Sequence, residues 1–434
     1  MKSLWTEDVE RPGFETLKGD KKTDVLIIGG GICGILCSYM LKQAGIRNIL
    51  VEADRICSGI TENTTAKLTY QHGLIYDKLI DNLGFEGAQL YLEAQRLAMR
   101  ELQALTKTAD CDYGECDSFV YSLTDRQKIE REVTAINRLG GRASFCESTR
   151  LPFSVAGAVK VEAQAQFHPL KLLYSISDGL DIYENTRVLE LRPDGAVTPL
   201  GRIRAQKIIV ATHFPFINKH GSYFLKLYQH RSYVIAFKNA PNLNGMYIDE
   251  SDTGLSFRNH KDLLLLGGGS HRTGKNGGNW KELSETAEKY YPDAVEVCRW
   301  ATQDCMTLDG MSYIGQYSKR TPNLYVATGF NKWGMSSSML SAMILRDLVC
   351  ERKNRYARLF SPSRSILHPQ LAINLAESLK GILTPTVPRC PHMGCALKYN
   401  PYEHSWDCSC HGSRFSHEGK VLDNPANGNL RKRQ

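Results

Sequence analysis

The first fifty residues alternate between short apolar runs and a stretch with helical spacing. Residues 24–28 (DVLII) form an apolar run of the length expected for a strand buried on both faces, and residues 49–51 form a second one. The sequence between them has the pattern of a helix up to about Ala44. A strand, a helix and a second strand in this order predict a βαβ unit in a parallel sheet.

Longer helical and strand patterns follow this unit. Apolar positions at helical spacing across residues 76–109 predict a packed pair of helices rather than a groove for a partner. The span Asp125–Leu139 has the pattern of another helix. The ranges that predict strands of one sheet are 222–239, 246–257 and 262–270.

The pattern changes again after residue 350. Residues 351–365 are basic and interrupted by proline, as expected of a linker. Residues 371–383 (LAINLAESLKGIL) predict a short amphipathic helix.

The composition is that of an ordinary folded protein with more than one unit. At 434 residues the chain is long enough for two or three units, and 42% hydrophobic residues with 23% charged residues can build a real core. The net charge of +8 is modest, and we expect its densest piece, Arg431-Lys432-Arg433, to be a solvated tail. We therefore expect no nucleic-acid partner.

The sequence predicts neither membrane insertion nor export. It contains no run of about eighteen apolar residues, and its N-terminus is acidic and lacks the apolar core of a secretory signal. Most of the thirteen cysteines are scattered through helical or strand-like sequence, as expected of free thiols in a reducing compartment. We therefore expect a cytoplasmic protein without a transmembrane segment.

A glycine-rich turn joins the first predicted strand to its helix. The sequence GGGICG (29–34) occupies the position that a dinucleotide-binding fingerprint requires. Gly29 would allow the tight turn, Gly31 would let the backbone approach a pyrophosphate, and Gly34 would let the helix pack closely on the strand. Glu52, at the end of the second strand, would accept hydrogen bonds from an adenosine ribose, and the plainer interpretation is a surface carboxylate.

Several later stretches resemble the D-amino-acid oxidase superfamily, which includes glycine and sarcosine oxidases. The matching stretches are the hydroxyl-rich loop 58–67 with Gln71-His72-Gly73, VEAQAQFHPLKLL (161–173), IYENTRVLEL (182–191), KIIVATH (207–213) and LYVATGFNKWGMSSSMLSAMILRDL (324–348). They occur in the order of the superfamily, over roughly residues 3–350. The resemblance implies that the bound dinucleotide is FAD.

The resemblance also implies which residues contact FAD. They are Thr61, Thr65 and Ala66 in the loop beneath the flavin, the backbone of Val188 against adenine, and Gly329, Gly334 and Met335 at the pyrimidine end of the flavin. A helix N-terminus at that end would stabilise negative charge on the reduced flavin.

A second glycine-rich stretch, LLLLGGGSHRTG (263–274), does not predict a second nucleotide site. Arg272 stands in place of the third glycine of the fingerprint, and no helix pattern follows. This argues against a flavin reductase driven by NAD(P)H.

Two short boxes near the C-terminus combine a thiol with an imidazole. They are Cys390-x-His392 and Cys408-x-x-His411. A Rieske [2Fe–2S] centre needs two thiolates on one iron and two imidazoles on the other, and each box would give one ligand to each iron. A structural zinc site would favour spacings such as Cys-x2–4-Cys, which the first box does not have. Cysteines that bind nothing are the other alternative.

This region is similar to the Rieske proteins beyond its ligands. Cys395 and Cys410 match the positions where high-potential members form a disulfide between the two cluster loops, so the resemblance implies that disulfide here. The unit is abbreviated, because only residues 382–389 are available before the first box and 23 residues follow His411. Either it leans on the rest of the chain, or part of a domain has been lost.

The predicted fold class is therefore α/β: an FAD-binding Rossmann-like domain with an interleaved α+β substrate domain, plus a small all-β Rieske-type unit. The expected boundaries are 1–355 for the oxidoreductase (FAD-binding parts about 20–75, 150–215 and 300–355; substrate parts about 76–149 and 216–299), 356–388 for the linker and short helix, and 389–434 for the Rieske unit.

Three residues are candidates for catalysis. His72 would lie at the flavin edge, where relatives use a histidine for a covalent flavin link, and packing within the loop is the plainer alternative. Tyr233 and Arg258 would contact the substrate from the predicted sheet above the flavin, or serve a structural role.

The segment WATQDCMTLDGMSYIG (300–315) bears on the substrate. It matches a motif that in amino-acid oxidases opens with an arginine that clamps the substrate carboxylate, and residues 300–304 contain no arginine. We therefore expect a small amine or an N-substituted compound rather than an α-amino acid.

These features predict an amine dehydrogenase that contains FAD and a [2Fe–2S] cluster. It would oxidise a C–N bond by hydride transfer to FAD and pass electrons singly through the cluster to an external acceptor, either a one-electron acceptor protein or a quinone. Such transfer requires that His392 or His411 face the flavin domain. Two alternatives stay open: a reductase component that feeds an oxygenase partner, and a redox sensor without turnover.

Overall fold

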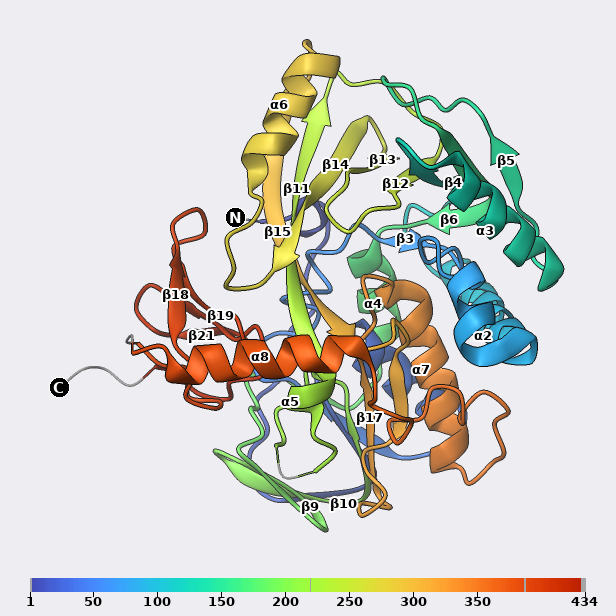
Figure 1. Cartoon of the computed structure of the whole chain (residues 1–434). Coiled ribbons are helices and arrows are strands. Elements are labelled where there is room, and N and C mark those ends of the chain that lie inside the picture. The colour runs from blue at the N-terminus through green and yellow to red at the C-terminus, as the bar shows by residue number, and fades with distance from the viewer. Residues whose placement is uncertain (1, 219, 386–387, 431–434) are drawn as a thin grey trace.

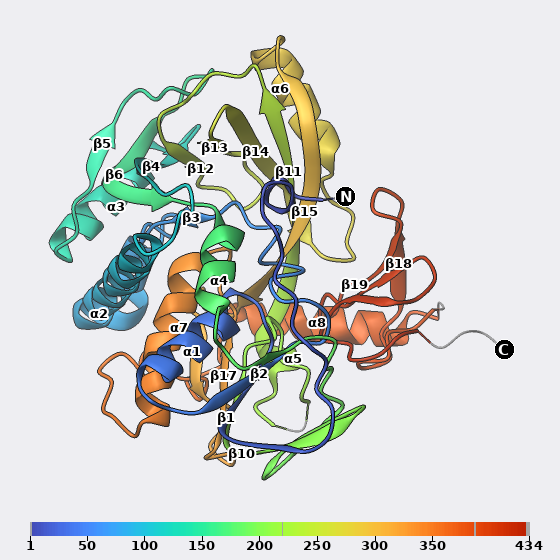
Figure 2. The same ribbon diagram turned by 180° about the vertical axis from the view of Figure 1, so that it is seen from behind.

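The computed structural model describes residues 2–218, 220–385 and 388–430, which form three sheets with helices around them (Figure 1, Figure 2). The basic tail Arg431-Lys432-Arg433 lies outside the described residues. Among the described helices, none has an apolar stretch long enough to cross a membrane.

The first sheet is built around the predicted βαβ unit. Its strands are β1 (Lys21–Ile28), β2 (Asn48–Val51), β7 (Ile182–Tyr183), β8 (Glu190–Arg192), β9 (Gly195–Thr198), β10 (Gly201–Val210), β16 (Tyr313–Gln316) and β17 (Leu324–Thr328). They follow the order β16-β17-β10-β1-β2-β7, and β8 and β9 extend from β10. The central strand β1 pairs in parallel with both β10 and β2.

Both faces of β1 are covered, which explains its continuous apolar run. Val25 and Ile27 belong to the main core with the helices, whereas Leu26 and Ile28 pack with residues of β9 and β10 on the other face. The helices of this layer are α1 (Ile32–Gln43), α4 (Pro169–Ser177) and α7 (Gly334–Val349).

A nine-stranded second sheet, here called the roof sheet, stands over the carboxyl ends of the first (Figure 1). Its strands are β3 (Lys67–Leu68), β4 (Gly114–Ser122), β5 (Ser144–Cys146), β6 (Gly157–Gln166), β11 (Leu227–Lys238), β12 (Met246–Asp249), β13 (Ser256–His260), β14 (Leu263–Arg272) and β15 (Val295–Thr307). The predicted strand 222–239 starts late, because α5 (Tyr223–Lys226) occupies its beginning. The predicted strand 246–257 is divided between β12 and β13. Helix α6 (Trp280–Tyr290) packs on this sheet.

The two long helical predictions hold with small changes at their ends. Helix α2 (Tyr76–Thr106) is interrupted at Gly84, whose φ of 72° and ψ of 172° are not helical, so the span is a pair of helices as predicted. Helix α3 (Arg126–Arg138) is capped by Asp125, whose carboxylate accepts a hydrogen bond from the backbone N–H of Lys128 (2.8 Å).

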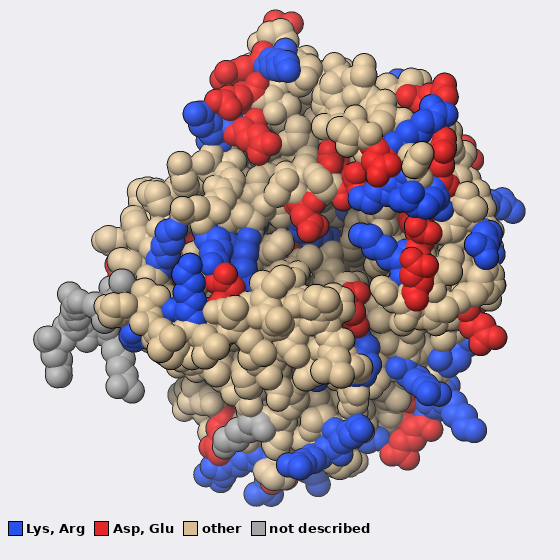
Figure 3. All heavy atoms as spheres, viewed as in Figure 1, with Lys and Arg blue, Asp and Glu red and all other residues tan. Residues whose placement is uncertain are grey.

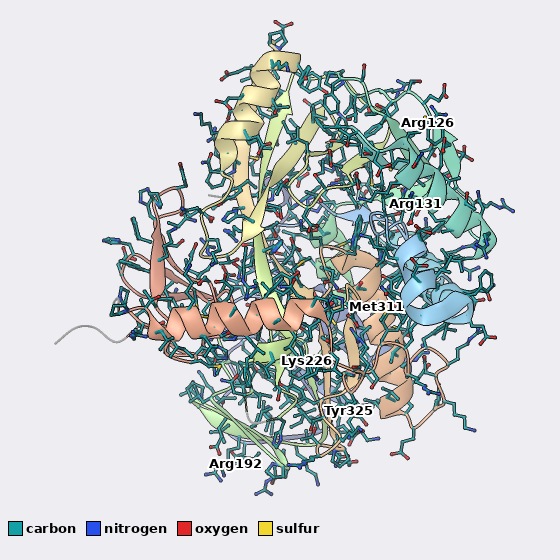
Figure 4. All side chains as sticks on the ribbon, viewed as in Figure 1. Arg126, Arg131, Arg192, Lys226, Met311 and Tyr325 are labelled. Atoms are coloured by element: carbon teal, nitrogen blue, oxygen red, sulfur yellow. The ribbon has the colours of Figure 1, made fainter. Side chains whose placement is uncertain are left out.

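The linker after α7 is held against the first sheet. Arg364 forms an ion pair with Asp309 (2.6 Å) and lies over the Tyr313 ring. Lys226, labelled below α8 in Figure 4, is buried and donates a hydrogen bond to the carbonyl oxygen of Pro362 (2.8 Å). These contacts fix where the next helix begins.

Helix α8 (Pro369–Leu383) connects the linker to the C-terminal unit (Figure 1). Its inner side presents Asn374, which is 2% exposed and accepts a hydrogen bond from Arg272 (3.0 Å), and Gly381, which packs against Cys395 and Cys410. The short amphipathic helix of the sequence prediction is therefore present and packs on both neighbouring parts of the chain.

The C-terminal unit (residues 388–430) is a small antiparallel sheet. Its strands, in order, are β18 (Leu397–Asn400), β19 (Ser405–Cys408), β20 (Arg414–Ser416) and β21 (Val421–Asp423). It rests on the roof sheet through Glu403, which pairs with Arg231 of β11 and with Arg414 of its own sheet (2.9 Å). Of the two alternatives for an abbreviated unit, the structure shows the one in which it leans on the rest of the chain.

Candidate functional site

The glycine-rich turn has the close contacts that its sequence predicts. Gly29 has a φ of +110°, and a Cβ atom there would lie 2.6 Å from the carbonyl oxygen of Ala211. A Cβ atom at Gly34 would lie 1.8 Å from the carbonyl oxygen of Gly29, so only glycine lets α1 pack this closely on β1. Gly31 is the N-cap residue of α1 and has no side chain to satisfy the first amides. The backbone N–H of Ile32 donates to the Thr61 hydroxyl (3.1 Å), and the helix N-terminus favours an anion nearby.

Glu52 ends β2 beside this turn. Its carboxylate accepts hydrogen bonds from the backbone N–H groups of Gly30 (2.7 Å) and Asp54 (2.9 Å). Burial raises its pKa, and these two donors oppose that effect. Glu52 is therefore held by hydrogen bonds to the glycine-rich turn and is not a free surface carboxylate. It also lines the cavity between the first sheet and the roof sheet.

A cavity of about 740 Å³ separates the first sheet from the roof sheet. Figure 3 shows the surface hollowed above α8, with acidic and basic side chains around the rim. The predicted FAD contacts that line the cavity are Gly29, Gly31, Glu52, Thr61, Thr65, Val188, Gly334 and Met335. Gly34, Ala66 and Gly329 do not line it and instead shape the backbone behind its wall.

His72 lies behind the cavity wall. Its Nδ1 is 2.8 Å from the Tyr91 hydroxyl, and its Nε2 is 3.0 Å from the Ser336 hydroxyl. Burial lowers the pKa of His72 to about 3, so the ring is neutral. The ring stacks on Trp333 (centroids 4.8 Å apart), and Trp333 lines the cavity. These contacts are those of a packed ring, and a role of His72 at the flavin edge stays a prediction.

The other two catalytic candidates have structural contacts. Arg258 is fully buried and donates hydrogen bonds to the carbonyl oxygens of Thr65 and Ala66 (3.0 Å for Ala66), which holds the hydroxyl-rich loop in place. Tyr233 borders the cavity, but its hydroxyl donates a hydrogen bond to Glu403 of the C-terminal unit (3.3 Å). One guanidinium nitrogen of Arg258, Nη2, has no hydrogen-bond partner among the described residues, so a role of either side chain in substrate contact stays a prediction.

Two charged residues that the sequence interpretation missed face the cavity. Lys67 has no acidic partner within ion-pair distance in the described part of the chain, and its pKa is lowered to about 7 by burial and by the nearby Arg258. Asp304, on β15, also faces the cavity, and burial raises its pKa to about 6. Lys67 is the last residue of the hydroxyl-rich loop 58–67, and this position was the one signal in the sequence that could have pointed to it.

The C-terminal unit forms part of the same cavity wall. Residues of the segment 420–427 line the cavity. Asn427 donates a hydrogen bond to the carbonyl oxygen of Val188 (3.0 Å), the residue predicted to meet adenine. Asn424 donates to the carbonyl oxygens of Thr212 and Phe214 (2.8 Å for Phe214). The two predicted cofactor sites are therefore built partly from the same segments.

The four predicted iron ligands come together at the base of this unit. Cys390 and Cys408 are buried, and the thiol of Cys390 lies beside that of Cys408. The rings of His392 and His411 lie 4.8 Å apart and nearly perpendicular. Burial lowers the pKa of His392 to about 4 and that of His411 to about 3, which keeps both imidazoles in the neutral form that binds metal.

The histidine nitrogens have free acceptor positions. Nδ1 of His392 and both ring nitrogens of His411 are buried without a hydrogen-bond partner among the described residues, whereas Nε2 of His392 is 2.8 Å from Asn218 Oδ1. Buried nitrogens without partners are costly unless a ligand satisfies them. Two thiols and two such imidazoles fit a Rieske cluster.

Cys395 and Cys410 lie next to the ligand set. Their sulfur atoms and that of Cys408 all lie within 4.8 Å of one another. Both are free thiols in the structure, which therefore does not contain the disulfide that the resemblance implied. The pair is close enough that oxidation would need only a small movement, so the disulfide stays a prediction.

The comparison with protein families decides what this arrangement is. The family model of the FAD-dependent oxidoreductases (DAO) matches residues 24–348. The chain belongs to this family of FAD-dependent oxidoreductases. The Rieske [2Fe–2S] domain model matches residues 363–433, so the protein is an FAD-dependent oxidoreductase that carries a Rieske domain. The oxidoreductase domain binds FAD, and the Rieske domain binds a [2Fe–2S] cluster.

Individual relatives agree with this assignment. A putative Rieske 2Fe-2S iron–sulfur protein, YhfW of Bacillus subtilis, is 34% identical over 98% of this chain and 96% of its own length. Gamma-glutamylputrescine oxidoreductase of Escherichia coli is 24% identical over 46% of this chain and 50% of its own length. Glycine oxidase from Geobacillus kaustophilus has the same fold, with a TM-score of 0.67 and 21% identity over 80% of this chain and all of that chain.

Proposed function

We propose that this FAD-dependent oxidoreductase is an amine dehydrogenase that delivers electrons through its Rieske cluster to an external acceptor. When bound, FAD would accept a hydride from the carbon that bears the nitrogen, and the cluster would carry electrons one at a time. The relatives support a nitrogen compound as substrate, because their names include a gamma-glutamylputrescine oxidoreductase and a glycine oxidase. We further propose a cytoplasmic location, because the nine cysteines outside the C-terminal unit are free thiols.

The observation that carries the proposal is a short segment after β10. Thr212, His213 and Phe216 line the cavity. Phe214, between them, is fully buried and packs its ring against His392 (6.4 Å between centroids) and His411 (6.3 Å). A segment that lines the cavity therefore also contacts both histidine ligands.

A glutamine from the roof sheet fixes this contact. Gln229 Nε2 donates hydrogen bonds to the carbonyl oxygens of His411 (2.8 Å) and Asn424 (2.9 Å). Gln303 Nε2 donates to Gln229 Oε1 (2.9 Å) and to the carbonyl oxygen of Gly412 (2.8 Å). These buried amides hold the ligand loop at a constant distance from the cavity, as electron transfer requires.

The cavity residues at the N-terminus of α7 suit a reaction that places negative charge on the flavin. The N-terminus of α7 opens at Gly334 and Met335, and a helix N-terminus favours nearby negative charge. Phe330 and Trp333 line the cavity beside it and would exclude water.

The test is anaerobic addition of amines and N-methyl amino acids to the FAD- and cluster-loaded protein. The proposal expects an active compound to bleach the flavin absorbance and then to produce the EPR signal of a reduced Rieske cluster. Cys390→Ser should abolish the EPR signal and leave flavin bleaching intact, whereas Cys350→Ser, a change at a half-buried thiol outside the cluster site, should alter neither.

Each alternative predicts a different result. Rapid bleaching by NAD(P)H without bleaching by any amine would support a reductase component. No bleaching by either class of compound would support a redox sensor. Bleaching by an amine without reduction of the cluster would refute the proposed electron path.

A further inference from the structure

The carboxylate of Asp304 is unusual among the charged groups of the cavity. It lies on β15, opposite His230 of β11, and faces the cavity. In the ranges that the structure describes, it forms neither a hydrogen bond nor an ion pair within 4.0 Å. Asp304 is half-buried at the cavity, and a carboxylate there that no protein group pairs is available to a ligand or a reaction.

The nearest cations do not satisfy this carboxylate. Lys332 donates hydrogen bonds to the Ser270 hydroxyl (2.8 Å) and to the carbonyl oxygen of Asp252 (3.3 Å). Arg231 is paired with Glu403. Both cations lower the pKa of Asp304, but burial outweighs them and raises it to about 6. Asp304 is therefore still ionised at neutral pH.

We propose that Asp304 binds a positively charged nitrogen of the substrate, so that the substrate is a cationic amine. This rests on the proposed function and narrows it. The carboxylate can accept two hydrogen bonds from an ammonium group, and the bound cation would compensate the charge that the protein leaves unpaired. The absence of arginine between Trp300 and Asp304 agrees with this, because this part of β15 offers the cavity a negative group.

Binding of an unreactive cation tests the inference separately from turnover. In tert-butylammonium the carbon that bears the nitrogen has no hydrogen, so it cannot donate a hydride, and tert-butanol is a neutral compound of nearly the same shape. Each would be titrated into the FAD-loaded protein at constant ionic strength and followed by the change in flavin absorbance. We expect tighter binding of the ammonium compound by about 10-fold or more, the size of one charge-assisted hydrogen bond.

Asp304→Asn is the matched variant, because it keeps the shape and removes the charge. It should bind both compounds equally, with FAD content and thermal midpoint close to those of the wild type. Asp262→Asn, at an exposed turn between β13 and β14, should keep the wild-type preference for the ammonium compound. With a reactive amine, Asp304→Asn should raise the concentration for half-maximal bleaching more than it lowers the limiting rate.

The outcomes separate the two proposals. An unchanged preference in Asp304→Asn, or no preference in the wild type, overturns the role of Asp304 even if amines reduce the flavin. A preference that depends on Asp304 supports the cation site even if none of the amines tested bleaches the flavin, and that second result would count against the proposed function alone.

Discussion

Glu403 joins the C-terminal unit to the roof sheet, and its charge should be required for the stability of that joint. Arg231 of β11 donates two hydrogen bonds to it, Arg414 donates one (2.9 Å), and Tyr233 donates one (3.3 Å). The side chains of Glu403, Arg231 and Arg414 are only 6%, 7% and 5% exposed. Glu403→Gln removes the charge and preserves the shape.

The structure gives the size of the expected effect. Burial raises the pKa of Glu403, but Arg231 and Arg414 outweigh it and hold the pKa at about 2, below its ordinary 4.5. Because the folded pKa lies below the unfolded one, this contribution is complete above pH 4.5 and is lost as the pH falls toward 2. The difference corresponds to about 3 kcal/mol, and leaving a buried partner charge unpaired costs about 3–5 kcal/mol.

We expect Glu403→Gln to lower the free energy of unfolding by about 3–5 kcal/mol at pH 7. The assay is urea unfolding of the FAD- and cluster-loaded protein, followed by flavin fluorescence and by the visible circular dichroism of the cluster. Glu418→Gln is the control, because Glu418 is exposed and accepts one hydrogen bond, from Ser416; it should change stability by less than about 0.5 kcal/mol.

A loss below about 1 kcal/mol in Glu403→Gln would refute this reasoning, because two buried guanidinium groups would then tolerate the missing charge. The double variant Arg231→Met/Glu403→Gln is a second check. It should recover at least about 1 kcal/mol relative to the single variant, since one of the unpaired charges is also gone.

Three further predictions concern the FAD site and its surroundings. Gly34→Ala should abolish FAD binding, measured as the flavin-to-protein absorbance ratio, because the added Cβ atom would lie 1.8 Å from a backbone oxygen. The control Gly13→Ala should bind FAD normally, because a Cβ atom there would have no other heavy atom within 4 Å. Asn427→Ala should weaken FAD binding about 5- to 10-fold in equilibrium dialysis, because the cavity wall at Val188 loses a hydrogen bond worth about 1 kcal/mol. Unchanged affinity for FAD would contradict a cavity wall that the C-terminal unit helps to build. His72 has a pKa of about 3 in the folded protein against an ordinary 6.5, so its contribution to stability is complete above pH 6.5, and about 2 kcal/mol of it is lost by pH 5. Chemical unfolding of His72→Asn at a series of pH values should lack this part of the pH dependence. The same dependence of unfolding free energy on pH in the variant and the wild type would be inconsistent with a neutral buried ring.

The sequence was sufficient for features that depend on local spacing. The fingerprint is one of them, because the tight turn at Gly29 and the close approach at Gly34 are set within six residues. The two Cys–His boxes are another, since the ligand chemistry fixes the residue types. The long helices were predictable from apolar periodicity, including the pair divided at Gly84, and only their ends differ.

The sequence was insufficient where function depends on residues that are distant along the chain. Tyr233 and Arg258 lie on roof strands as predicted, but which face of a strand meets the substrate depends on what packs against the other face. The hydroxyl of Tyr233 donates a hydrogen bond to Glu403 of the C-terminal unit, and Arg258 donates one to the carbonyl oxygen of Thr65 in the hydroxyl-rich loop. No local pattern reports such contacts.

The charged groups in the cavity illustrate the same limit. Asp304 follows the polar residues Thr302 and Gln303 in β15, so nothing in the sequence distinguishes its carboxylate from a solvent-facing side chain. Only the fold, which sets β15 beside β11 at the cavity, makes it a half-buried carboxylate that faces this space.

The wall contributed by residues 420–427 has a consequence for how the holoprotein assembles. Gly29 and Asn427 face the same space, although almost the whole polypeptide lies between them. A nascent chain can form its βαβ unit early, yet the pocket stays open on one side until the last strands have been synthesised and docked. Tight retention of FAD should therefore report that the iron-binding end of the chain has already folded.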